Sequence, residues 1–261
     1  MFDWFSDFLG TDAHEFTPEE IASAWREAVG FWGIEVALSP PEPHDSRSDR
    51  GDGPGHEPVA YIDLERRQVV VNFEWLGTRG LEEALPAVFA HEIGHHVEFP
   101  RTLGSMAELE VMERRLLPTY DESLVNLFLD LQINEKLGGR WADQILAIYE
   151  TAPEERGPIF TFYLAIYEEL WGTEPGRLVG DGTDVRMEQA YPGWRADARM
   201  FAQTFYGLPD THLQFAYFCS RFSRYIRSRR SRRRRITREP CGRRRRGEPK
   251  PRSRRPRSAA G

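Results

Sequence analysis

The sequence predicts an α+β fold in which a small amino-terminal sheet precedes a mainly helical carboxyl-terminal half. Two short runs of β-branched residues, 59–63 and 68–73, are typical of strands. From about residue 81 onward, apolar residues recur at helical spacing. Residues 228–261 are rich in arginine, proline, serine and glycine and have too few apolar residues to form a core. We therefore predict one folded domain, 1–227, and a disordered arginine-rich tail, 228–261.

The first predicted element is a helix that begins at Pro18. Thr17 is a good capping residue, proline is tolerated in the first helical position, and Glu20 lies where it can complete a capping box. One apolar face continues to Val29, and the glycines at 30 and 33 are expected to end the helix.

A small sheet is expected next. Residues 34–38 alternate between apolar and other side chains, which indicates a strand, and residues 39–58 have the composition of a loop. The runs 59–63 and 68–73 are separated by four residues, so we expect them to be adjacent strands.

A helix over about 86–97 carries the most informative pattern in the chain. Pro86 is expected in its first turn, where proline is tolerated. His91 and His95 are four residues apart, so on a helix they point in the same direction and can share one metal ion. Glu92 lies between them, where it can reach a water on that metal. The spacing His-Glu-x-x-His in an apolar helix predicts a zinc site with Glu92 as the general base.

The rest of the domain is predicted to be helical. Pro118 and the pair Gly138–Gly139 are expected to end two of the helices. The predicted helices are 105–117, 121–137, 141–149, 159–171, 194–206 and 212–227.

Two histidines do not complete a catalytic zinc site, which usually has three protein ligands and a water. The helix predicted over 121–137 carries a polar stripe spaced by four residues: Glu122, Asn126, Asp130 and Asn134. Asp130 is the acid most deeply embedded among apolar neighbours, and such a carboxylate needs a partner or a metal. We predict Asp130 as the third ligand. The alternative is that it accepts a hydrogen bond from a ligating histidine. Asn126, Glu122 and Asn134 are the other candidates for either role.

Charge divides the sequence into an acidic body and a basic tail. Residues 221–261 carry 19 of the 35 lysines and arginines and two of the 41 acidic residues. Such a tail is expected to bind polyanions non-specifically and in a salt-dependent manner. The abrupt change in composition is also what a shifted reading frame in GC-rich DNA would produce. Two cysteines, no secretory signal and no long apolar run favour a cytoplasmic protein without a membrane span. No pattern specifies an oligomeric state.

The residues His91-Glu92-Ile-Gly-His95, followed by Asn126-xxx-Asp130, resemble zincin-type metallopeptidases of prokaryotes that carry an Asn-xxx-Asp helix after the motif. That helix is similar to the Glu-xxx-Asp helix of gluzincins, in which the glutamate is the third zinc ligand. The chain departs from that pattern, since Asn126 stands at the glutamate position. The resemblance covers about residues 60–140 and implies a zincin-like fold, bound Zn²⁺ and hydrolysis of a protein or peptide substrate.

The resemblance also implies a donor that stabilises the oxyanion, for which Tyr120, Tyr163 and His212 are candidates. Two rival functions remain. The Asn126 departure is compatible with an inactive zincin-fold scaffold or binding protein, and the basic tail is compatible with a nucleic-acid-associated protein.

Overall fold

The computed structural model describes residues 13–33, 37–41, 59–63, 65–120, 123–151 and 157–226. The chain divides into two units, 1–226 and 227–261, and the second unit lies outside the described residues. The predictions for the arginine-rich tail, for Glu122 and for most of the loop 39–58 therefore fall outside them as well. None of the helices in the described ranges is long and apolar enough to cross a membrane.

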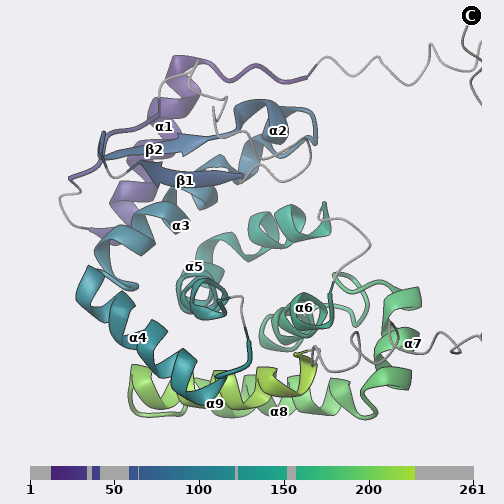
Figure 1. Cartoon of the computed structure of the whole chain (residues 1–261). Helices are drawn as coiled ribbons and strands as arrows, with labels where there is room; N and C mark the ends of the chain where they lie inside the picture. Colours follow the sequence, from purple (N-terminus) through teal and green to yellow (C-terminus); the bar gives the residue numbers. More distant parts are fainter. Residues whose placement is uncertain are drawn as a thin grey trace, which may run out of the picture. The chain divides into compact units, whose positions relative to one another are not determined.

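The described residues of the first unit are mostly helical, with one two-stranded sheet on the amino-terminal side, which confirms the α+β prediction (Figure 1). The elements, in chain order, are α1 Pro18–Trp32, β1 Ala60–Asp63, β2 Gln68–Val71, α2 Phe73–Gly77, a 3₁₀ turn Glu82–Ala84, α3 Leu85–Val97, α4 Leu103–Leu116, α5 Val125–Glu150, α6 Pro158–Leu170, α7 Asp181–Ala190, α8 Trp194–Phe205, α9 Thr211–Phe222 and a 3₁₀ turn Ser223–Tyr225.

Helix α1 forms as its sequence predicts. The Thr17 hydroxyl accepts a hydrogen bond from the Glu20 backbone N–H, and the Glu20 carboxylate accepts one from the Thr17 backbone N–H, so the capping box is complete. The helix ends at Gly33, whose φ of 64° lies in the left-handed region that favours glycine. The buried residues of α1, Ile21, Ala24 and Ala28, pack it against α3.

The sheet is a hairpin of β1 and β2. The strands are antiparallel, with Ala60 opposite Val71 and Asp63 opposite Gln68. Ser39, which directly follows the predicted strand 34–38, forms a single parallel bridge with Gln68. Residues 34–36 of that strand lie outside the described residues. The buried side chains of β2 connect the hairpin to the apolar face of α3.

Helix α5, Val125–Glu150, consists of two helical segments that meet at a kink. We expected one helix over 121–137 to end at Gly138–Gly139 and a second to cover 141–149, and two segments are present. The first begins at Val125, and the interruption lies at Trp141, whose φ of −130° and ψ of 27° are not helical, rather than at the glycines. Gly138 instead accommodates a neighbour, because a Cβ there would lie 2.7 Å from the indole nitrogen of Trp171. Helices α2 and α7 were not predicted.

Two apolar cores meet at α5. The amino-terminal core joins α1, β2, α3 and the middle of α5, and it includes Ile133 and Trp141. The carboxyl-terminal core joins α4, the start of α5, α6, α8 and α9, and it is rich in phenylalanine and tyrosine. Because α5 contributes to both cores, its polar side chains between them are held on a rigid element.

Helices α3 and α5 approach closely at Gly94, which gives the first testable prediction. A Cβ on Gly94 would lie 2.8 Å from Cγ2 of Ile133 and 2.9 Å from Cζ2 of Trp32. Because both neighbours are packed core side chains, Gly94→Ala should lower the free energy of unfolding in urea by about 1–3 kcal/mol. The matched control is Gly139→Ala on α5, where nothing lies within 4 Å of the added Cβ. That change should raise stability by about 0.5–1 kcal/mol. A Gly94→Ala protein as stable as the wild type would contradict the close packing.

Candidate metal centre

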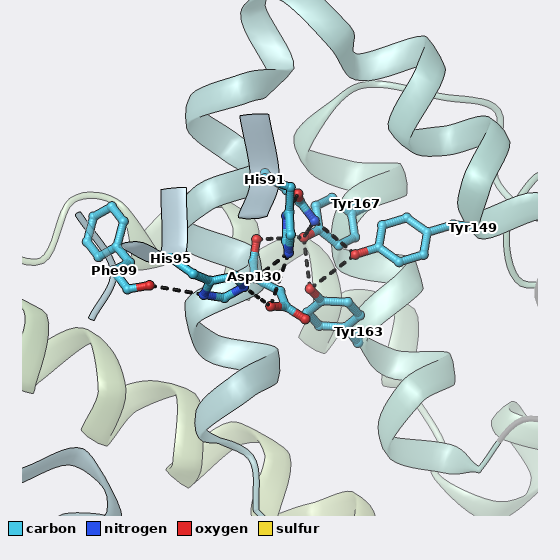
Figure 2. Close-up of polar contacts among 8 residues, drawn as sticks. His91, His95, Phe99, Asp130, Tyr149, Tyr163 and Tyr167 are labelled. Atoms are coloured by element: carbon cyan, nitrogen blue, oxygen red, sulfur yellow. Dashed lines mark hydrogen bonds and ion pairs between the residues drawn. The ribbon is translucent and has the colours of Figure 1, made fainter. Parts of the chain in front are cut away.

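Helix α3 presents His91 and His95 to one point. They lie one turn apart, and their Nε2 atoms are 3.1 Å from each other. Both side chains are largely buried, at 22% and 23% exposure. Figure 2 shows the two imidazoles converging on the carboxylate of Asp130. The predicted pairing of the two histidines on one helical face is therefore present in the structure.

Asp130 of α5 supplies the third donor. Its Oδ1 atom lies 3.1 Å from Nε2 of His95 and 3.5 Å from Nε2 of His91. One ligand atom from each residue lies within 4.8 Å of the others, so the three side chains form a group that could hold a metal ion. The glycine at position 94 makes this possible, because it lets α5 approach α3 closely enough for one carboxylate to reach both rings.

The other nitrogen of each ring is also engaged. Nδ1–H of His91 donates to Oδ1 of Asn134 at 2.8 Å, and Nδ1–H of His95 donates to the backbone carbonyl of Phe99 at 3.0 Å. In a neutral imidazole with Nδ1 protonated, Nε2 carries the lone pair. Both histidines are thus held in the tautomer in which Nε2 can ligate, an arrangement typical of metal-binding histidines.

No family model, curated protein or solved structure matches this chain. The case for a function therefore depends on the site itself.

Glu92 lines a cavity together with His91 and Asp130, two of the three donors. The cavity has a volume of about 160 Å³. Its polar lining consists of His91, Glu92, Asp130, Asn134 and Tyr149, and its apolar lining consists of Val59, Ala60, Ala87, Val88, Ile145 and Ile148. The apolar residues come from the start of β1, from α3 and from the part of α5 beyond the kink. A carboxylate beside three potential ligands, in a mostly apolar pocket, is able to take up and return a proton.

The electrostatics of the centre favour a positive charge at the point where the donors meet. Burial lowers the pKa of His91, but the hydrogen bond and negative charge of Asp130 outweigh it and raise the pKa to about 9. Burial raises the pKa of Asp130, but its hydrogen bonds with His91 and His95 outweigh that and hold the pKa well below its ordinary value. Burial raises the pKa of Glu92, although the two histidines oppose this. The three donors therefore stabilise a cation between them, whether a proton or a metal ion.

The remaining sequence candidates are placed as follows. Asn126 lies one turn before Asp130 on α5, is exposed, and is not part of the cavity lining. Glu122 lies outside the described residues. Asn134 is buried and orients His91, one of the roles considered for it.

The candidate oxyanion donors are not in the cavity lining. Tyr120 packs on the carboxyl-terminal core, and His212 lies beside Glu108 in a separate groove between α4 and α9, with 3.6 Å between its Nε2 and the carboxylate. Tyr163 is fully buried behind the site. The tyrosine that does line the cavity, Tyr149, was missed. It lies on α5 beyond the kink, and no spacing in the sequence connects it with the motif.

Proposed function

We propose that this protein is a zinc-dependent hydrolase of peptide bonds with a zincin-like arrangement around its motif helix. The observation that carries the proposal is the convergence of His91, His95 and Asp130 on one point, with Glu92 in the cavity that His91 and Asp130 also line. Catalytic zinc is typically held by three protein ligands, with a fourth position left for water or substrate. Two imidazoles and one carboxylate match that donor set.

The roles of the residues follow from their positions. When bound, zinc supplies an acidified water and polarises the carbonyl of the scissile bond. His91 and His95 present Nε2 to the metal because Asn134 and Phe99 hold their Nδ1–H groups. Glu92 accepts the proton of the attacking water and returns it to the leaving amine. The apolar walls of the cavity exclude bulk water and contact the side chains of the substrate.

The positions of Asp130 and Asn134 offer an explanation for the asparagine at position 126, where gluzincins carry a glutamate ligand. The resemblance to the gluzincin Glu-xxx-Asp helix placed Asn126 at the ligand position, whereas Asp130 and Asn134 are the pair that faces the histidines. We therefore assign the ligand role to Asp130 and the histidine-orienting role to Asn134, one turn later than the motif alone suggested. This assignment removes the main argument for an inactive scaffold.

Two other functions receive less support. The same set of two histidines and one carboxylate also holds iron(II) in oxygenases. Glu92 favours hydrolysis, because a half-buried carboxylate next to the proposed ligands can act as a base for water and has no part in binding oxygen. Binding of polyanions by the arginine-rich tail stays a prediction, as does the cytoplasmic location.

The test is removal and restoration of the metal. Zinc-loaded protein should cleave unfolded protein substrates, which mass spectrometry detects as new amino termini. A chelator should abolish cleavage, and stoichiometric zinc should restore it, because the bound water loses its activation without the metal. Elemental analysis should find about one zinc per chain. A protein that binds zinc but cleaves no protein or peptide would favour the scaffold, and one that retains iron instead would favour oxygenase chemistry.

A further inference from the structure

A cluster of tyrosine hydroxyls lies behind the candidate metal centre. Nδ2 of Asn134 donates to the hydroxyls of Tyr149 and Tyr167, at 2.9 Å each. The hydroxyl of Tyr163 lies 2.9 Å from that of Tyr167 and 3.4 Å from that of Tyr149. Figure 2 shows the three rings gathered on the side of His91 away from His95. The amide of Asn134 is thus the only link among these contacts between the hydroxyls and a metal-ligating histidine.

The direction of each hydrogen bond matters here. The Tyr167 hydroxyl lies 3.4 Å from the backbone carbonyl of Asp130 and 2.9 Å from the Tyr163 hydroxyl, so it has two neighbours other than Asn134 to which it can donate its single proton. With the proton directed to either of them, the oxygen of Tyr167 is an acceptor for Asn134. The structure has the NH₂ end of the amide facing the tyrosines and its carbonyl end facing His91, where it accepts from Nδ1–H.

The reversed amide would have the opposite effect on His91. With the amide turned by 180°, Nδ2 would face His91, and Nδ1 would have to accept instead of donate. The proton of a neutral ring would then lie on Nε2, the atom that points to Asp130 and His95. A protonated Nε2 cannot ligate a metal. The orientation of one buried amide therefore decides whether His91 is a ligand.

We infer that Tyr149 and Tyr167 are positioning residues that fix the orientation of the Asn134 amide and thereby keep Nε2 of His91 available for the metal. The inference rests on the proposed function, because it assigns a role within the same metal centre. Burial supports it. Tyr167 on α6 is fully buried and Asn134 is 2% exposed, so bulk water does not replace the Tyr167 hydroxyl as a partner of the amide, whereas Tyr149 holds the amide from the cavity side.

The experiment compares tyrosine-to-phenylalanine variants by their affinity for zinc, measured by cobalt(II) titration and zinc competition. The double variant Tyr149→Phe with Tyr167→Phe removes both acceptors from the amide and should lower affinity by about 10–100-fold, the range typical for groups that hold a ligand. The matched control is Tyr206→Phe, which removes a half-buried hydroxyl that donates to the Leu131 carbonyl of α5, the helix of Asn134, at 3.0 Å. It should leave zinc affinity unchanged, although both changes lower the stability of the metal-free protein.

A change at position 134 separates orientation from packing. Asn134→Asp gives a side chain whose two oxygens are equivalent, so it accepts from His91 in either orientation. In that background the double tyrosine variant should leave zinc affinity unchanged. Equal losses in both backgrounds would overturn the inference, as would an equal loss in Tyr206→Phe.

A second measurement does not depend on the Asn134→Asp variant. In zinc-loaded protein, the Nδ1–H signal of His91 should be sharp in the wild type and exchange-broadened in the double tyrosine variant, whereas that of His95 should be sharp in both, because Phe99 holds it. A sharp His91 signal in the double variant would overturn the inference. Tyrosine-dependent zinc affinity without any hydrolysis would support the inference and contradict the proposed function, whereas a wild type that binds no metal would overturn both.

Discussion

Replacing Asp130 with alanine is expected to lower the affinity of the protein for zinc by more than about 100-fold, beyond the range typical of groups that only support a ligand. Its carboxylate is the donor from α5 that reaches both Nε2 atoms, at 3.1 and 3.5 Å. Without it, two imidazoles remain as donors, and the negative charge that contacts both of them is lost. Affinity should be measured by competition with a chelator of known strength.

Asn126→Ala is the matched control for this prediction. Asn126 lies on the same helix, one turn earlier, and is exposed. Its removal should leave zinc affinity unchanged. Equal and modest losses in the two variants would show that Asp130 only orients a histidine, which is the alternative that the sequence leaves open.

Glu92→Gln is expected to keep the zinc and lower the turnover of a peptide substrate by about 100-fold to 10,000-fold. The substitution keeps the size of the side chain and removes its ability to accept a proton. Since Glu92 lines the cavity but is not one of the three donors, metal content should stay at the wild-type level. Elemental analysis and single-turnover kinetics on the same preparation separate the two effects.

Glu98→Gln provides the control for Glu92. Glu98 caps the same helix and pairs with Lys136 at the surface, away from the cavity lining. It should retain wild-type turnover. If the Glu92→Gln protein kept wild-type turnover as well, Glu92 would not be the base and the mechanism proposed here would fail.

Local patterns predicted the parts of the fold that depend on neighbours in sequence. The capping box at Thr17 and Glu20 formed because both partners lie within one turn. The pairing of His91 with His95 is likewise a consequence of helical spacing. The glycines at 138 and 139 placed the interruption of α5 only approximately, since the kink lies at Trp141. A glycine that ends a helix cannot be told locally from one that makes room for a distant ring, as Gly138 does for Trp171.

Long-range contacts account for what the sequence could not show. The polar stripe identified Glu122, Asn126, Asp130 and Asn134 as candidates, but only the packing of α5 on α3 decides that Asp130 and Asn134 are the two that contact the histidines. The contact between Asn134 and the tyrosine cluster was even less accessible to sequence reasoning, because Tyr167 lies 33 positions from Asn134 and belongs to another helix. A single sequence contains no periodicity that would connect these residues.

The kink at Trp141 divides α5 into two segments that contribute different residues to the site. The segment before it carries Asp130 and Asn134, and the segment after it carries Ile145 and Ile148, which wall the cavity. Under the proposed function, substitutions at those two isoleucines are expected to change the size of the substrate side chain that fits the cavity and to leave the proposed metal ligands in place. With this division, the residues that line the cavity can change during evolution, and with them the preferred substrate, while the residues of the proposed metal centre stay the same.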